Sequence, residues 1–252
     1  MSREYNLPEG MVISGYSLVY MPEYEVVCIS DLHLGFEVYM ESEGLYLPRM
    51  QLKIEEERIR TILREYAPST VLINGDIKQE FSRNTSQEWL EIKKLFSLIT
   101  ERCNVVVVKG NHDNYILNIA AKYGIKVTKS VRFGSTVFAH GDTVVTTERG
   151  KAVVIGHEHP AIRVVDSVGA YYKFPAFIYF AEDPLLILPA FSPFSLGTDV
   201  ISDWHTFQSP YLTGREGDDA TVFAVLNGEV RKLGRVSSIR AAIASGSSDF
   251  DL

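Results

Sequence analysis

The chain has 252 residues, which is long enough for one large α/β domain with a buried core, and its composition is that of an ordinary globular protein. A formal net charge of -7 argues against a broad basic face that grips duplex phosphates, although it allows a small nucleic-acid substrate held mainly by metal ions. Cys28 and Cys103 are the two cysteines, so we expect no disulfide framework. No secretory signal is visible at residues 1–10, and the apolar tract 171–191 is a poor membrane span. We therefore expect a cytoplasmic protein without a membrane partner.

Five short runs rich in Val and Ile each end in polar residues or glycine. The runs end at Asp31, Asp76, Gly110, His140 and Gly156. Between the first three, residues 49–66 and 86–102 carry apolar side chains at helical spacing. Strands that alternate with helices predict βαβ units and a mostly parallel sheet, whose functional groups gather beyond the carboxyl ends of the strands.

The chain after Gly156 reads as short strands, which predict a second sheet. The expected strands are residues 164–168, 171–180, 185–188, 221–226 and 229–233. Residues 1–236 are expected to form a single domain, and the Ser/Gly-rich residues 237–252 to form a flexible tail. The long connection 36–48 is equally compatible with a loop at a substrate cleft and with a packed surface loop.

Polar side chains with metal-binding chemistry cluster at the predicted strand ends. Asp31 and His33 lie two residues apart, as do His157 and His159, and in an extended chain each pair would point to one side. Each residue alone would most often be a cap or a turn residue. Together, however, five of the six histidines of the chain follow predicted strands, which is hard to explain by structural roles.

The candidate ligands form a mixed nitrogen and oxygen set without a thiolate. Such a set favours Mn²⁺, Fe²⁺ or Zn²⁺ over a cysteine-based structural zinc or an all-oxygen calcium cage. The seven candidates exceed what one ion needs, whereas two ions could share Asp76 and activate a water for attack on phosphorus. They are Asp31, His33, Asp76, Asn111, His140, His157 and His159.

In order, the ligand motifs and the step Gly110-Asn111-His112-Asp113 resemble the calcineurin-like metallophosphoesterase superfamily. The resemblance implies an α/β fold, a four-layer α/β/β/α sandwich with two central mixed β-sheets. It implies a hydroxide that bridges two ions as the nucleophile, and His112 as the general acid, oriented by Asp113. One ion would be bound by Asp31, His33, Asp76 and His159, and the other by Asp76, Asn111, His140 and His157.

Longer stretches are similar to SbcD-related phosphoesterases of archaea and bacteria, over about residues 26–235. The similar stretches are residues 31–37, 44–49, 156–162 and 188–191. This similarity implies manganese-dependent cleavage of phosphodiesters in DNA repair, beside a DNA ligase or an Lhr-type helicase, with Fe²⁺, Zn²⁺, Ni²⁺ or Co²⁺ as alternative metals. The chain departs from the pattern at Gln79, where a histidine is expected, and it lacks residues for the capping domain of full SbcD nucleases.

Three functions are compatible with these motifs. The first is a phosphodiesterase or nuclease whose substrate is single-stranded DNA or a nucleotide. The second is a phosphomonoesterase or nucleotide pyrophosphatase for a small phosphate ester. The third, a noncatalytic scaffold of the same fold, is the least favoured because every ligand and His112 are retained.

Overall fold

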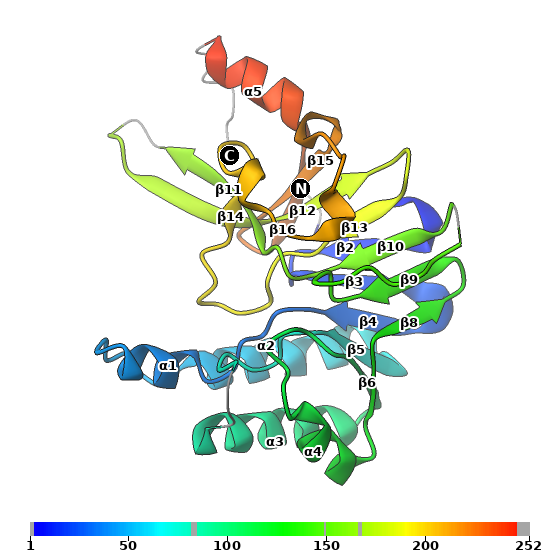
Figure 1. Ribbon diagram of the computed structural model, residues 1–252, viewed down its shortest axis with the longest axis vertical. Coiled ribbons are helices and arrows are strands. Elements are labelled where there is room, and N and C mark those ends of the chain that lie inside the picture. Colours follow the sequence, from blue (N-terminus) through cyan, green and yellow to red (C-terminus); the bar gives the residue numbers. More distant parts are fainter. Residues whose placement is uncertain (1–2, 82–84, 149, 166–167, 246–252) are drawn as a thin grey trace.

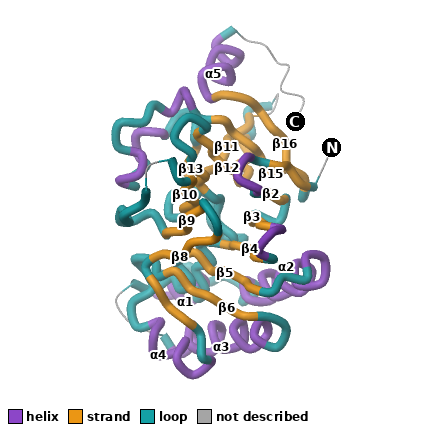
Figure 2. Tube along the Cα trace, turned by 90° about the vertical axis from the view of Figure 1, so that its right-hand side faces the viewer, coloured by secondary structure: helices purple, strands orange, loops and turns teal. Residues whose placement is uncertain are grey.

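The computed structural model describes residues 3–81, 85–148, 150–165 and 168–245. Two β-sheets lie face to face in the middle of the molecule, with most of the helices below them and the C-terminal helix above them in the view of Figure 1. Figure 2 shows the same layers from the side. Within the described part, no helix combines the length and apolar character needed to span a membrane.

The first sheet joins an N-terminal antiparallel meander to a parallel half, and its order follows the sequence. Its strands are β1 (Glu4–Asn6), β2 (Val12–Ser14), β3 (Leu18–Met21), β4 (Val26–Ile29), β5 (Thr70–Asn74), β6 (Asn104–Val108) and β7 (Lys126–Thr128). Strands β4 to β7 are parallel, with Ile29 beside Ile73 and Ile73 beside Val107. The aligned ends place the loops after β4, β5 and β6 along one edge, as the sequence predicted.

Helices cover the outer face of this sheet (Figure 1). They are α1 (Phe36–Ser42), α2 (Gln51–Tyr66), α3 (Ser86–Thr100) and α4 (Ile116–Ala120). The two predicted amphipathic helices are confirmed as α2 and α3. Helix α3 begins with a capping box, because the Thr85 side chain accepts from the Glu88 N–H while the Glu88 carboxylate accepts from the Thr85 N–H. Part of the 36–48 connection is the short helix α1.

The second sheet is also mixed, and β15 and β16 extend it beside β12. Its strands are β8 (Ser130–Phe133), β9 (Thr136–Ala139), β10 (Ala152–Ile155), β11 (Pro160–Val165), β12 (Tyr171–Phe180), β13 (Leu185–Ile187), β14 (Thr198–Asp199), β15 (Thr221–Leu226) and β16 (Glu229–Arg235). Strand β10 is parallel to β9 and β13, whereas β12 is antiparallel to its neighbours. Strand β11 begins earlier than predicted, because Pro160 and Ala161 pair with the edge strand β14.

The central strands are buried on both faces, because alternate side chains along each strand point into different cores. In β4, Val27 and Ile29 face the helices, whereas Val26 and Cys28 face the second sheet. The core between the sheets is filled from the other side by residues such as Phe177. A strand buried on both faces reads as a continuous apolar run, as the sequence of β4 does.

The C-terminal segment differs from the predicted flexible tail. Residues Val236–Ala244 form the helix α5, and Val236 and Ile239 are buried against the outer face of the second sheet. Two apolar residues on one side of the helix supply the contact, which the Ser/Gly-rich composition of the whole stretch 237–252 concealed. The prediction of a flexible tail over residues 237–252 is therefore wrong for residues 237–244, and residues 246–252 lie outside the described part.

The predicted mixed α/β fold with two central sheets is confirmed. The fourth layer is thinner than the first, because α5 and short 3-10 turns such as Trp204–Thr206 pack on the second sheet in place of a row of helices.

Candidate metal centre

The candidate ligands lie on tight loops that directly follow buried strands. Asp31 follows β4, Asp76 follows β5, Asn111 follows β6, His140 follows β9 and His157 follows β10. Several ligand candidates have backbone φ angles in the left-handed region, which non-glycine residues rarely adopt. Their φ angles are 59° at Asp31, 51° at His33, 50° at Asp76, 68° at His157 and 46° at His159. Strained residues of this kind concentrate at functional sites, because the surrounding structure must hold them there.

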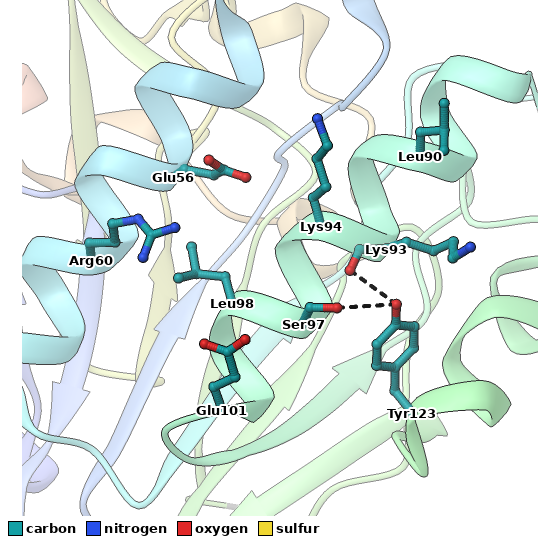
Figure 3. Close-up of a pocket in the computed structure, with 9 residues that line it drawn as sticks. All are labelled: Glu56, Arg60, Leu90, Lys93, Lys94, Ser97, Leu98, Glu101 and Tyr123. Atoms are coloured by element: carbon teal, nitrogen blue, oxygen red, sulfur yellow. Dashed lines mark hydrogen bonds between the residues drawn. The ribbon is translucent and has the colours of Figure 1, made fainter.

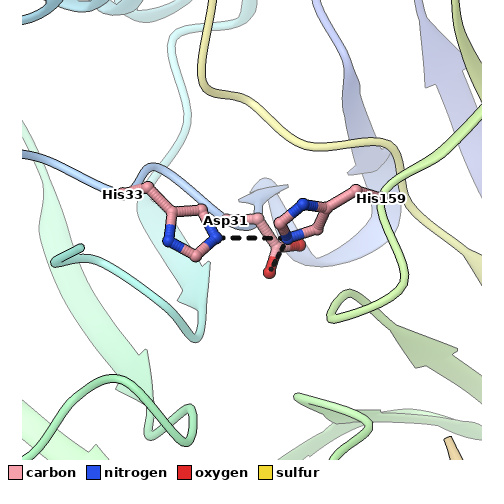
Figure 4. A group of neighbouring side chains, drawn as sticks. All are labelled: Asp31, His33 and His159. Carbon is pink, nitrogen blue, oxygen red and sulfur yellow. Dashed lines mark hydrogen bonds and ion pairs between the residues drawn. The ribbon is translucent and has the colours of Figure 1, made fainter. Parts of the chain in front are cut away.

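Asp31, His33 and His159 form the first ligand group, and their ligand atoms lie within 4.8 Å of one another. The rings of His33 and His159 point toward each other, with the carboxylate of Asp31 beside His159 (Figure 4). The two Nε2 atoms are 3.2 Å apart, and His159 Nε2 is 3.1 Å from Asp31 Oδ1. Ring nitrogens and a carboxylate oxygen that converge in this way fit a divalent ion.

Asp76, His140 and His157 form the second ligand group, again with ligand atoms within 4.8 Å of one another. The Nε2 atom of His140 is 3.3 Å from Asp76 Oδ2 and 3.1 Å from Asn111 Oδ1. The second group therefore offers two imidazoles, one carboxylate and one amide oxygen.

Asp76 faces both groups with a single oxygen. Its Oδ2 atom is 3.3 Å from His140 Nε2 in the second group and 3.9 Å from His33 Nε2 in the first. The side chain is buried, and its other oxygen, Oδ1, accepts a hydrogen bond of 2.9 Å from the His112 N–H. This arrangement fixes the carboxylate between the two groups.

Hydrogen bonds outside the ligand groups set the orientation of two rings. His140 Nδ1 donates to the backbone oxygen of Asn74 at 3.0 Å, and His159 Nδ1 lies 3.1 Å from Ser195 Oγ. A carbonyl oxygen can only accept, so His140 carries a proton on Nδ1 and presents Nε2 to the site. The Nδ1 atom of His33 is buried and has no hydrogen-bond partner in the described part of the chain.

Burial disfavours the charged form of each ionisable side chain in the centre. The neighbouring charges then strengthen or outweigh the effect of burial on the pKa. Burial and the nearby His159 lower the pKa of His33 to about 4. At His140, burial is outweighed by the hydrogen bond to Asp76, which raises the pKa of this histidine to about 10. At Asp76 too, burial is outweighed by His140, so the pKa of the carboxyl is held well below its usual range. A proton on His140 would balance the charge of the buried carboxylates, and a bound divalent cation would take over that role with release of the proton.

His112 lies beside the first group, and its ring is fixed by the backbone. Its Nδ1 atom donates to the backbone oxygen of Gln79 at 2.7 Å. A ligand atom of His112 also lies within 4.8 Å of those of His33 and Asp76. With Nδ1 engaged, Nε2 is the ring nitrogen of His112 for which the described part of the chain provides no hydrogen-bond partner.

Asp113 has a different role from the predicted one. Its carboxylate accepts from the Ile77 N–H at 2.8 Å and from the Gly110 N–H at 2.9 Å. Burial and the charge of Asp76 raise its pKa to about 6. The prediction that Asp113 orients His112 is wrong, because Asp113 ties together the loops after β5 and β6, and the Gln79 carbonyl takes the orienting role.

The two histidines of the 157–159 motif belong to different ligand groups. His157 lies with Asp76 and His140, whereas His159 lies with Asp31 and His33. The expectation that both point to one side assumed an extended chain, and their left-handed φ angles break that alternation. The assignment of His157 to one group and His159 to the other does match the two ligand sets that the family resemblance implies.

Glycines let the ligand loops approach one another closely. A Cβ atom on Gly110 would lie 2.1 Å from Asp76 Oδ1, and one on Gly75 would lie 2.2 Å from His140 Nδ1. Neither neighbour is a free surface side chain, because both are buried in the centre. Glycine at these positions is therefore required by packing as well as by the turn at Gly75, where φ is 92°.

Gln51 supports the first group from behind and was not recognised in the sequence. This fully buried residue begins α2, and its Nε2 atom is 2.8 Å from the Leu32 oxygen and 3.0 Å from the His33 oxygen. Its Oε1 atom accepts from the Phe36 N–H at 3.2 Å. A polar residue at the start of an amphipathic helix gives little signal in sequence, because it is usually exposed.

A surface hollow between α2 and α3 has a different character (Figure 3). Its lining alternates acidic and basic side chains around Leu90 and Leu98, and Ser97 and the Lys93 oxygen both lie 3.2 Å from the Tyr123 hydroxyl. None of the candidate ligands lines it, so the chemistry belongs to the strand ends.

The chain belongs to the calcineurin-like phosphoesterase family, whose model matches residues 24–195. A comparison with curated proteins found no significant match. Among solved structures, the nuclease MPE of Pseudomonas putida is similar, with a TM-score of 0.66 and 16% identity over 92% of this chain and 100% of that chain. YfcE, a phosphoesterase from E. coli, gives a TM-score of 0.38 and 13% identity over 80% of this chain and 88% of its own. Family membership makes the chain a metallophosphoesterase, and the likeness to MPE shows the shared fold.

Proposed function

We propose that this protein is a two-metal phosphodiesterase that cleaves nucleic acid, with single-stranded DNA as the preferred substrate and Mn²⁺ as the metal. The position of Asp76 Oδ2 between the two ligand groups is the observation that carries the proposal, because one carboxylate oxygen serves both groups. Asp31, His33 and His159 would hold one ion, and Asn111, His140 and His157 the other, with Asp76 shared. Bound ions would polarise the phosphate and lower the pKa of the attacking water.

His112 supplies the proton for the leaving oxygen. Its Nδ1 proton is held by the Gln79 carbonyl, so a protonated ring has its second proton on Nε2, and the ring lies beside His33 and Asp76 of the ligand groups. Transfer of this proton leaves a neutral ring with the Gln79 hydrogen bond unchanged. The ring therefore needs no reorientation during the step, which suits a general acid.

The choice of a nucleic-acid substrate is supported by the fold shared with MPE, which is a nuclease, and by the SbcD-like motifs of the sequence. The net charge of -7 favours a short segment of single strand bound at the metals over an extended duplex. A role in DNA repair, together with a ligase or a helicase, is part of this proposal.

The test compares bis-p-nitrophenyl phosphate, p-nitrophenyl phosphate and an end-labelled single-stranded oligonucleotide, each with Mn²⁺, Fe²⁺, Zn²⁺, Ni²⁺ or Co²⁺ and with a chelator. We expect Mn²⁺-dependent cleavage of the diester and the oligonucleotide, with the monoester hydrolysed far more slowly. Activity confined to the monoester would replace the proposal with a phosphomonoesterase. Absence of hydrolysis with every metal would favour a noncatalytic scaffold.

A further inference from the structure

Phe81 is an exposed aromatic residue beside the proposed proton donor. Its ring centroid is 5.7 Å from that of His112, with the two planes at 88°. Its side chain is nevertheless 53% exposed. A single exposed apolar side chain is ordinary on protein surfaces, so exposure alone means little. Phe81 differs from such residues because its ring is in edge contact with His112, a histidine of the site.

The backbone around Phe81 is held in place by several hydrogen bonds. Its carbonyl oxygen accepts from Asn114 Nδ2 at 3.1 Å. The Glu80 N–H donates to Glu88 Oε1 at 2.6 Å, and the Gln79 N–H donates to the Leu34 oxygen at 2.9 Å. Phe81 is therefore presented to solvent on an anchored segment. An aromatic ring that is fixed before binding loses little conformational entropy when a ligand stacks on it.

The geometry of the ring pair leaves Phe81 able to stack. In a perpendicular pair, the edge of one ring meets the face of the other, so His112 covers at most one face of Phe81. Phe36 and Phe194 are different, because they stack on each other at 5.6 Å and 27°. Each of those rings has a face already occupied by its partner.

We infer that Phe81 is a stacking platform for the nucleobase on the leaving-group side of the scissile phosphate. This inference rests on the proposed function, since it requires His112 to face the leaving oxygen. In a nucleic acid, that oxygen is joined to a base through one sugar ring, so the base of the leaving nucleoside lies on the His112 side. Every base has an aromatic face, so stacking on Phe81 binds single strands without reading their sequence.

The experiment uses the full-length protein with Mn²⁺ and three dinucleotides: thymidylyl-thymidine and the two analogues in which one or the other nucleoside is replaced by an abasic tetrahydrofuran residue. The kcat/KM of each is measured for the wild type, Phe81→Ala, Phe81→Tyr and the control Leu90→Ala. Leu90 on α3 is also 53% exposed, and it lines the hollow of Figure 3. Metal content and melting temperature are measured in parallel to confirm that each variant is folded and loaded.

We expect the wild type to lose about 10-fold or more in kcat/KM when the leaving-side base is absent, in the range of base stacking on an aromatic side chain. Phe81→Ala should lower cleavage of the intact dinucleotide by a similar factor and remove the preference for the base, whereas Phe81→Tyr and Leu90→Ala should retain it. Equal cleavage of intact and abasic substrates by the wild type, or a preference that survives in Phe81→Ala, would overturn the inference and leave the proposed function standing. Failure of the wild type to cleave any dinucleotide or oligonucleotide would overturn both.

Discussion

His112 Nδ1 donates a hydrogen bond of 2.7 Å to the backbone oxygen of Gln79, one residue beyond a fully buried lysine, Lys78. The contact uses the main chain, so the side chain at position 79 does not determine it. The histidine that the SbcD-like pattern expects at this position is therefore unnecessary for orienting His112. This relationship makes His112 the residue whose substitution separates proton transfer from metal binding.

His112→Ala should lower kcat with Mn²⁺ by about 10² to 10⁴-fold, because general-acid catalysis typically contributes that much. The metal content should stay unchanged, since the two ligand groups are complete without this residue. Steady-state kinetics and elemental analysis of the same preparation test both parts. A variant that loses metal in proportion to activity would show that His112 is a ligand.

Gln79→Ala should retain kcat within about a factor of three, because the carbonyl that holds His112 is still present.

Asp113→Asn should instead lower the free energy of unfolding by about 1–3 kcal/mol, since one amide oxygen replaces the two carboxylate oxygens that now accept from Ile77 and Gly110. Urea unfolding and kinetics of both variants distinguish these roles. A large loss of kcat in Gln79→Ala would assign a catalytic role to its side chain.

Gln51→Leu should weaken Mn²⁺ binding by about 10- to 100-fold, the usual cost of removing a residue that orients a ligand. The reason is that Leu32 and His33 lose the donor that holds their carbonyl oxygens. Gln87→Leu, at a half-buried position in the first turn of α3 where the side chain donates to Glu91, is the matched control and should bind Mn²⁺ like the wild type. Isothermal titration calorimetry well below the melting temperature measures the affinity, and equal affinities in the two variants would refute the positioning role.

Glu55 should make stability depend on pH. Burial raises the pKa of its carboxyl well above the ordinary value of 4.5, and its Oε2 atom has no hydrogen-bond partner in the described part of the chain. From pH 4.5 upward, the unfolded chain loses this proton before the folded protein does, so the contribution of Glu55 to stability falls as pH rises toward the folded pKa. Glu55→Gln has no ionisable group at this position, so its stability does not fall with pH for this reason.

The free energy of unfolding of Glu55→Gln relative to wild type should therefore increase with pH above 4.5 and then level off. Glu57→Gln, at an exposed position on the same helix, is the control and should follow the wild-type curve. Urea titrations at several pH values measure both. Parallel curves for wild type and Glu55→Gln would show that Glu55 is ionised in the folded protein.

The sequence predicted the central strands and the main helices because their patterns are local. Val26 to Ile29 is apolar at every position, and α2 and α3 carry apolar residues at helical spacing. Family motifs then pointed to the ligand positions at the strand ends. The N-terminal meander β1 to β3 was missed, because its strands are short and are ordered by pairing with one another and, at β3, with β4.

The finer arrangement of the site depends on contacts between distant residues, which a sequence pattern does not contain. The left-handed backbone at His157 and His159 separates two neighbours that an extended chain would align. Likewise, Asp113 contacts Ile77 across two loops, although its neighbour in sequence is His112. Helix α5 escaped prediction because only Val236 and Ile239 carry its packing signal.

The shared role of Asp76 is tested most directly by the number of Mn²⁺ ions per chain in the wild type, in Asp76→Ala and in the control Asp219→Ala, which alters an exposed acidic residue. Elemental analysis after removal of free metal gives this number. The two-metal proposal predicts about two ions per chain in the wild type and in Asp219→Ala, and less than one in Asp76→Ala, because both ions lose a ligand. One ion per chain in the wild type, or two in Asp76→Ala, would contradict it.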